Sequence, residues 1–281
     1  MKRPDLVGLN DAGLNGVTPE EAVAACLEGK AGSTILFVVD HASNHVPPGI
    51  ELGIEPALLG THIAIDIGSA ALARRLSALL GAPACIAAMS RLVVDFNRDP
   101  MAAGVIPAAS DGKPIPGNVG LGDPQRNQRL GWHDRYHRLV GEMAAQADLL
   151  VSVHSFTPCL ESTPDEPRPW PVGILHNRDD RAARLALDAF RRQGIMAGDN
   201  QPYSGKVLNY SMDRHAEAEG IPYLGIEVRQ NEIGHDAGVE RWAGILAPII
   251  RDVHEALAPA RLDLTSIKQE RAALMRRERD Q

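Results

Sequence analysis

Residues 34–45 read TILFVVDHASNH, an apolar and β-branched run followed directly by a polar segment. A short continuous run such as Thr34 to Val39 is typical of a strand buried on both faces, as in a parallel sheet. Open α/β sheets bind ligands beyond the carboxyl ends of their strands, which is where Asp40 to His45 would lie. This stretch therefore predicts the fold class and the place of the functional site.

Strands and helices are expected to alternate outward from this stretch. Further apolar runs predict strands at residues 85–88, 92–96, 149–153, 172–175 and 223–228. Segments bounded by caps, prolines or glycines predict helices at residues 18–29, 66–81, 124–146, 181–193, 211–219 and 239–257. In the second helix, Asp66 is expected to be the cap, and the apolar face contains Leu72, Leu76 and Leu79. This alternation predicts an α/β domain with a mostly parallel central sheet and helices on both faces.

The chain is expected to fold as one domain followed by a charged tail, because it contains no internal repeat and no linker composition. Residues 1–265 would form the domain, and residues 266–281 would form either a solvated helix or a frayed end. Residues 102–122 are rich in Gly and Pro and predict a long loop inside the domain. Long loops are uncommon in compact domains and often have a functional role.

Composition and charge exclude several classes of protein. The chain has 281 residues, enough for one large domain or two small ones with a hydrophobic core. Lys and Arg number 29 against 36 Asp and Glu, a net charge of −7 without a basic stripe, so no nucleic-acid partner is expected. The first residues lack the apolar run of a secretory signal, and no apolar segment is long enough to span a bilayer. These features predict a cytoplasmic protein without a membrane partner.

The three cysteines, Cys26, Cys85 and Cys159, are odd in number and far apart in the sequence. Such a set is typical of a protein in a reducing compartment. Since no two of them have the close spacing of paired ligands, the pattern argues against a disulfide framework and against a thiolate zinc site.

Histidines lie at the ends of two of the predicted buried strands. His41 follows the first strand, His154 ends another, and Asp66 begins the first helix after His41. Two imidazoles and one carboxylate can hold a zinc ion and leave a coordination position open. The alternative is that each histidine is a loop residue bonded to the backbone. Because acidic residues accompany both histidines, we expect a metal site at His41, Asp66 and His154.

A carboxylate and several arginines accompany these histidines. Glu227 lies in an apolar strand, where an ionised carboxylate is costly unless it is paired or functional. A glutamate beside a metal ion can act as general base, and the alternative is a buried ion pair with Arg229 or another arginine. Arg91, Arg98 and Arg229 flank predicted strands, and a guanidinium group binds a carboxylate through two parallel hydrogen bonds. Together they predict a pocket for a substrate carboxylate.

Other polar groups give weaker indications. His133 and His137 are spaced like a metal pair on a helix but lack the glutamate of a zincin, so surface or packing roles are expected. The turn-rich segment 199–205 could close over a ligand. The segment after the first strand lacks the glycine spacing that a dinucleotide site requires.

Several segments taken together resemble the N-formylglutamate amidohydrolase family. The resemblance runs in family order from Val38 to Ile233, and no single segment is specific by itself. The matching segments are VVDHASNHVPPG, HIAIDIG, SRLVVDFNRDP, DGKPIPGN, VSVHSFTP, GDNQPYS and GIPYLGIEVRQNEI. The resemblance implies a zinc-dependent amidohydrolase related to zinc carboxypeptidases and zinc cell-wall amidases, with the phosphorylase/hydrolase-like fold of the carboxypeptidases.

The resemblance also implies roles for individual residues. His41 and His154 fall on metal-ligand positions. The acidic ligand falls on Asp66 by comparison with the cell-wall amidases, or on Asn44 by the His-x-x-Glu pattern of the carboxypeptidases. Asp66 is preferred, because an asparagine is a poor zinc ligand. Glu227 matches the catalytic glutamate.

The remaining implications concern the substrate. Asn97 and Arg98 match an Asn-Arg pair that grips the substrate carboxylate. The first motif, DHASN, departs from that of the histidine-utilisation enzymes that use N-formylglutamate, and this departure leaves the substrate open.

These observations lead to one expected activity. We expect a zinc-dependent hydrolase that cleaves a non-peptide amide C–N bond in a small acidic N-acyl amino acid similar to N-formylglutamate. One zinc ion would lower the pKa of a bound water, Glu227 would act as base, and Arg91 would help the metal to stabilise the oxyanion. The expected substrate-binding residues are Asn44, Asn97, Arg98, Ser155 and Arg229.

Two alternatives stay open at this point. One is a zinc peptidase or cell-wall amidase that acts on a larger substrate, although the lack of a signal sequence argues against the amidase. The other is a metal- or ligand-binding protein without turnover. The expected partner is a small molecule with a carboxylate, and a homo-oligomer is compatible with the sequence.

Overall fold

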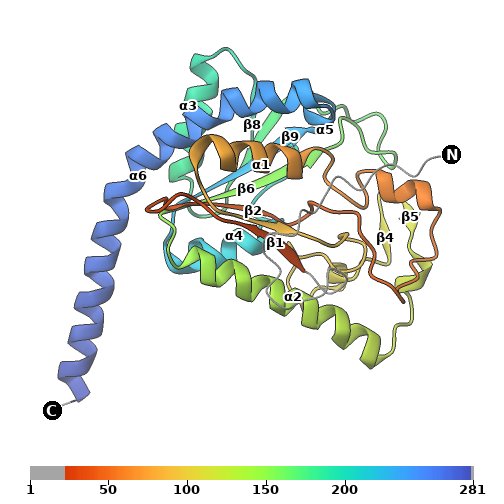
Figure 1. Cartoon of the computed structure of the whole chain (residues 1–281), viewed down its shortest axis with the longest axis horizontal. Coiled ribbons are helices and arrows are strands. Elements are labelled where there is room, and N and C mark those ends of the chain that lie inside the picture. Colours follow the sequence, from red (N-terminus) through yellow and green to blue (C-terminus); the bar gives the residue numbers. More distant parts are fainter. Residues whose placement is uncertain (1–22, 280–281) are drawn as a thin grey trace.

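A seven-stranded sheet lies at the centre of the part of the chain that the computed structural model describes, residues 23–279, with side chains described to residue 258 (Figure 1). The strand order is β1-β3-β2-β6-β9-β7-β8. Their bounds are β1 Ala24–Leu27, β2 Ile35–Val39, β3 Ala84–Ala87, β6 Leu149–Phe156, β7 Val172–Leu175, β8 Ala197–Asp199 and β9 Tyr223–Arg229. Strands β3, β2, β6 and β9 are parallel neighbours, whereas β1 and β7 run antiparallel to β3 and β9. The mostly parallel sheet predicted from the sequence is confirmed.

Helices cover both faces of this sheet. On one face lie α1 Ser69–Leu80, α3 Arg181–Arg192 and α6 Asp236–Arg279, and on the other lie α2 Asp123–Ala144 and α4 Tyr210–His215 (Figure 1). Side chains of β2 alternate between the two cores: Phe37 and Val39 pack with α1 and α6, whereas Val38 packs with α2. The apolar run at 34–39 therefore forms a strand that is buried on both faces, as predicted. Among residues 23–279, no helix combines the length and apolarity needed to cross a membrane.

The segment 102–122 contains structure that the sequence did not predict. It holds a small hairpin, β4 Ala109–Ser110 and β5 Lys113–Pro114, between the 3₁₀ turns η3 Ala103–Val105 and η4 Pro116–Asn118. The hairpin lies to the right of the large sheet in Figure 1. The remaining short elements are η2 Pro56–Gly60, η5 Glu217–Glu219 and α5 Gln230–Ile233.

The segment 92–96, predicted as a strand, forms a turn instead. Its apolar residues are buried in or beside the core under α2, but they do not pair in the sheet. The backbone N–H of Val93 donates to the Ser90 carbonyl, and that of Asp95 donates to the Val105 carbonyl. The prediction was wrong because local hydrogen bonds can satisfy a buried backbone without a strand partner.

Several predicted helices have different bounds or faces. The predicted start at Thr18 lies outside the described residues, and 24–27 is strand β1, so a helix there is wrong. Leu79 is 40% exposed, whereas Leu72 and Leu76 are buried as predicted. The predicted helix at 211–219 is divided into α4 and η5, and α6 continues past the predicted end at residue 257.

Asp66 does not cap α1, which is a second correction to that helix. The N-cap is Gly68, whose φ of 83° suits a residue without a side chain. A Cβ atom at Gly68 would also lie 2.2 Å from the carbonyl oxygen of Ile233. The Asp66 side chain, which is not used as a cap, faces His41 and His154 instead.

The cysteines are closer in space than in sequence. All three are free thiols, but Cys26 and Cys85 are register partners across β1 and β3. Their separation in the sequence was therefore a poor guide to their distance in the fold.

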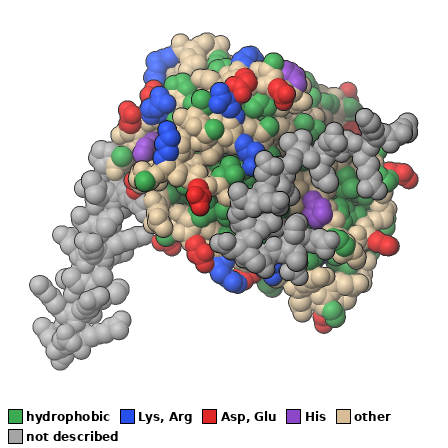
Figure 2. Space-filling model, in the orientation of Figure 1, with side chains coloured by type: hydrophobic (Ala, Val, Ile, Leu, Met, Phe, Trp, Pro, Cys, Tyr) green, Lys and Arg blue, Asp and Glu red, His purple; other side chains and the backbone are tan. Residues whose placement is uncertain are grey.

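On the face shown in Figure 2, acidic and basic side chains are interspersed among apolar ones.

Candidate metal centre and pocket

The residues singled out at the strand ends meet at one edge of the sheet. His41 follows β2, His154 lies near the end of β6, and Glu227 lies in β9. Strands β2 and β6 are parallel neighbours, and His154 is the register partner of Glu227. Because the carboxyl ends of parallel neighbours share an edge, the topology brings these side chains together as the sequence predicted.

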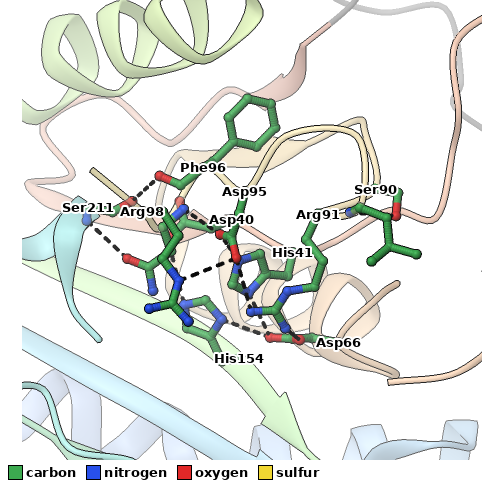
Figure 3. Close-up of polar contacts among 12 residues, drawn as sticks. Asp40, His41, Asp66, Ser90, Arg91, Asp95, Phe96, Arg98, His154 and Ser211 are labelled. Carbon is green, nitrogen blue, oxygen red and sulfur yellow. Dashed lines mark hydrogen bonds and ion pairs between the residues drawn. The ribbon is translucent and has the colours of Figure 1, made fainter. Parts of the chain in front are cut away.

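His41, Asp66 and His154 form a buried cluster that could hold a metal ion. One ligand atom from each lies within 4.8 Å of the other two. The Oδ2 atom of Asp66 lies 3.4 Å from Nδ1 of His41 and 2.8 Å from Nδ1 of His154 (Figure 3). The backbone N–H of Asp66 donates to the His41 carbonyl at 2.9 Å, which fixes the two segments side by side.

A carboxylate faces Nε2, the outer ring nitrogen that points away from Asp66, in both His41 and His154. Nε2 of His41 lies 2.7 Å from Oδ1 of Asp95. Nε2 of His154 lies 3.6 Å from Oδ2 of Asp40, whose other oxygen accepts a hydrogen bond from Tyr136 at 2.7 Å. A carboxylate on the outer nitrogen sets the tautomer and orientation of a metal-binding histidine. The hydrogen bond with Asp95 thus leaves Nδ1 of His41 to face Asp66, whereas the 3.6 Å separation at His154 is too long for a hydrogen bond and leaves its Nε2 without a partner.

The donor set fits a divalent metal ion. Nδ1 of His41 is buried without a hydrogen-bond partner, and it faces the oxygen of Asp66 that also faces His154. Two imidazole nitrogens and one carboxylate oxygen suit zinc and several other first-row metals. The alternative reading, in which both histidines are bonded to backbone, does not describe this arrangement, since carboxylates surround both rings.

Arg91 pairs with the second oxygen of the Asp66 carboxylate. Its Nη1 donates to Oδ1 of Asp66 at 2.9 Å, and its Nη2 lies 3.6 Å from Oδ2 of Asp95. Burial acts to raise the pKa of Asp66, but the charges of His41 and Arg91 outweigh it and hold this pKa far below its usual range. The centre therefore offers ionised oxygen at neutral pH, as a metal ligand must be deprotonated.

Glu227 is the buried carboxyl group without a fixed partner at this edge. It is 7% exposed, and its Oε2 atom has no hydrogen-bond partner. Burial raises the pKa of Glu227 to about 7, with the charge of His154 acting against this shift and that of Asp66 adding to it. The ion pair with Arg229 considered from the sequence does not form, because that guanidinium binds Glu232, Asn231 and the carbonyls of residues 168 and 169.

A cavity of about 470 Å³ opens beside the cluster. This size suits a small molecule. Most of the predicted site residues line this cavity: His41, Asp66, Arg91, Asn97, Arg98, His154, Ser155 and Glu227. Tyr203, from the turn-rich segment 199–205, lines it as well. Asn44 and Arg229 do not line it. The Asn44 side chain donates instead to the carbonyl of Leu59.

Arg98 is the arginine of the cavity with the least engaged guanidinium group. Its side chain is 37% exposed, and its Nε atom lies 3.8 Å from Asp95. Asn97 accepts a hydrogen bond from the backbone of Ser211, and the Ser155 hydroxyl donates to the Ile67 carbonyl. Of this group, Arg98 is therefore the side chain best able to bind a substrate anion.

The helix histidines support the segment that carries Arg98. His133 and His137 are buried, and their Nε2 atoms bond to the carbonyls of Arg98 and Phe96. Nδ1 of His137 bonds to Nε2 of His215 at 2.9 Å. Of the surface and packing roles that the sequence left open, these contacts show the packing role.

Asp40 and Asp95 are the site residues whose roles sequence reasoning missed. Both stand beside apolar residues, in FVVDH and in VVDFN. This is the signal that singled out Glu227, because a carboxylate in an apolar run is costly unless it is paired. Applied to every aspartate, it would have found both.

Comparison with known proteins gives two kinds of match. The family model described as N-formylglutamate amidohydrolase matches residues 33–233. A solved gene product from Agrobacterium tumefaciens is similar at 28% identity and a TM-score of 0.80, covering 85% of this chain and 97% of that one. An N-formylglutamate amidohydrolase from Ralstonia eutropha is similar in fold, at 18% identity and a TM-score of 0.60, covering 85% and 99%. A search of the curated proteins gave no match.

Proposed function

The chain belongs to the N-formylglutamate amidohydrolase family, and on that premise we propose that it is a metal-dependent amidohydrolase acting on small acidic N-acyl amino acids. The observation that carries the proposal is the buried His41, Asp66 and His154 cluster with Glu227 beside it in one small cavity. Ligands and a candidate base on the same cavity wall are what hydrolysis of an amide requires.

We propose zinc as the metal. Nδ1 of His41, Oδ2 of Asp66 and Nδ1 of His154 would hold it, with Asp95 and Asp40 orienting the two rings. When bound, the ion would supply Lewis-acid polarisation of the amide carbonyl and activation of water.

Glu227 would take the proton from the attacking water and deliver it to the leaving amine. Efficient general acid–base catalysis needs a group whose pKa lies near the working pH. Burial raises the pKa of Glu227 to about 7, and its Oε2 atom is not committed to another partner. Both properties support this role over that of a structural ion pair.

Arg98 would bind the substrate carboxylate, with Asn97 beside it. A guanidinium group that is only loosely paired can form two parallel hydrogen bonds with a carboxylate. Arg91 is already paired with Asp66 and Asp95, so we assign it first to holding the ligand carboxylate. Any N–H group of Arg91 that these contacts leave unpaired would stabilise the oxyanion, together with the metal.

The second candidate is a peptidase or cell-wall amidase that acts on a larger substrate. The cavity size favours the small substrate. The test is amine release by the zinc-loaded protein from N-formyl, N-acetyl and N-succinyl derivatives of glutamate and aspartate, with N-acetylleucine and a pentapeptide for comparison. We expect acidic N-acyl amino acids to exceed the neutral one in kcat/KM by about tenfold or more, as one charge-assisted contact predicts. Faster cleavage of the pentapeptide would contradict the proposal.

A further inference from the structure

Asp111 occupies the turn of the β4–β5 hairpin, in a conformation that the turn itself requires. Ser110 and Lys113 are register partners, so Asp111 and Gly112 form a two-residue hairpin loop. Their φ angles are 43° and 74°. Turns with two positive φ angles favour Asp-Gly and Asn-Gly, so the hairpin explains an aspartate here without any role for its charge.

The side chain of Asp111 nevertheless makes contacts that the turn does not need. Oδ2 accepts hydrogen bonds from the backbone N–H of Glu161, at 2.9 Å, and from Nε2 of His62, at 2.8 Å. Oδ1 accepts from the backbone N–H of Ser162, at 2.9 Å, and from the hydroxyl of the same residue. The side chain is only 4% exposed. One carboxylate thus joins three segments that are distant in the sequence.

All three segments belong to the wall of the cavity. The turn after η2 contributes His62 and Ile63, and the hairpin contributes residues 109–112. The segment after β6 contributes Thr157, Leu160 and Ser162. Asp111 is therefore a residue that bonds all three of these parts of the wall to one another.

We propose that Asp111 determines how large a substrate the cavity admits, by holding these three wall segments together. The inference rests on the proposed function for the substrate class, and it adds a residue and a size limit to it. A neighbouring contact between two of these segments, the hairpin and the segment after β6, is the ion pair of Lys113 with Glu161 at 2.7 Å, whose side chains are exposed. Exposed pairs contribute little to stability, so Lys113→Ala is a matched control.

Two variants distinguish the contacts of the Asp111 side chain from its role in the turn. Asp111→Gly removes the carboxylate but tolerates the positive φ, so the hairpin can still form. Asp111→Asn also suits the turn, and it keeps one acceptor oxygen while losing the charge. Activity is measured as kcat/KM on N-formylglutamate and on N-octanoylglutamate, with Kd values for both from calorimetry. Deuterium exchange is followed in peptides that contain residues 157–166.

The expected result is a change in selectivity. In Asp111→Gly, the ratio of kcat/KM for the octanoyl over the formyl substrate should rise about tenfold or more, the order expected from losing one or two hydrogen bonds to a charged group. Exchange at Glu161 and Ser162 should accelerate, Asp111→Asn should fall between, and Lys113→Ala should behave as wild type.

The outcomes separate this proposal from the function on which it rests. If the wild type turns over neither substrate but the Kd ratio shifts in Asp111→Gly, the proposed function fails and the size limit stands. If exchange accelerates while both the kcat/KM and Kd ratios stay at wild-type values, Asp111 fastens the wall without setting substrate size, and the proposal is overturned. Unchanged exchange would overturn it as well.

Discussion

Nδ1 of His154 lies 2.8 Å from Oδ2 of Asp66, although the two residues are 88 positions apart in the sequence. The contact joins the end of β6 to the segment before α1, and the same oxygen lies 3.4 Å from Nδ1 of His41. Each histidine presents its outer nitrogen to a different aspartate. This relationship supports Asp66 as the third member of the candidate metal centre.

Replacing Asp66 and Asn44 separately tests that assignment. Asp66→Asn keeps the shape of the side chain but removes the anionic oxygen, and we expect metal affinity to fall about 10- to 100-fold or more. Asn44→Ala should retain the metal, because its amide bonds to the Leu59 carbonyl. Competitive titration with a chromogenic chelator measures both. Loss of metal only in Asn44→Ala would favour the carboxypeptidase-like ligand assignment.

Glu227→Gln tests the general base. The variant keeps size and hydrogen bonding but cannot accept a proton, so kcat should fall by about two to four orders of magnitude with metal content unchanged. Glu232→Gln serves as the control, since Glu232 pairs with Arg229 outside the cavity. Near-wild-type kcat in Glu227→Gln would make Glu227 a structural residue and place the base elsewhere.

Arg98→Lys tests the substrate clamp. Lysine keeps the charge but loses the two-pronged geometry, so KM for an acidic substrate should rise while kcat changes less. Arg229→Lys is the informative comparison, because both arginines are candidates from the sequence and only Arg98 lines the cavity. Steady-state kinetics on one N-acyl amino acid measures the two effects. A larger KM change in Arg229→Lys would reverse the assignment.

The buried His137 and His215 pair should make stability fall in weakly acidic solution. Burial lowers the pKa of His137 to about 3 and that of His215 to about 4, whereas an unfolded histidine titrates near 6.5. Below about pH 6.5 the unfolded chain binds protons that the folded chain does not, so this contribution is complete above that pH and is lost as pH falls toward 4.

Denaturant unfolding at several pH values between 5 and 7.5 measures this effect. For His215→Gln we expect a pH slope smaller than that of the wild type by about 1 kcal/mol per pH unit. His235→Gln, at an exposed position, should keep the wild-type slope. Equal slopes in wild type and His215→Gln would show that the pair does not control acid stability.

The sheet was predictable because its buried strands leave a direct trace in the sequence. Continuous apolar runs gave β2, β6 and β9, and polar residues at their ends indicated the functional edge. The same reasoning failed at 92–96, because burial alone does not distinguish a strand from a packed turn. The backbone N–H of Val93 donates there to the carbonyl of Ser90, three residues back, a contact that an extended strand rising about 3.3 Å per residue cannot make.

The site was predictable in its residue types but only partly in its geometry. Glu227 and the two histidines stood out as polar groups in apolar runs. Which nitrogen of His41 faces Asp66 depends on the hydrogen bond between its Nε2 and Asp95, which lies on a segment whose approach no local pattern predicts. For the same reason Arg229 was indistinguishable from Arg98, since both follow apolar runs and only tertiary structure turns one of them into the cavity.

The most direct test of the central claim is the metal content of the purified protein, measured by mass spectrometry together with turnover of an acidic N-acyl amino acid. We predict about one divalent ion per chain, loss of turnover on chelation, recovery on addition of zinc, and loss of the ion in His154→Ala. Full turnover by metal-free wild-type protein would contradict the account.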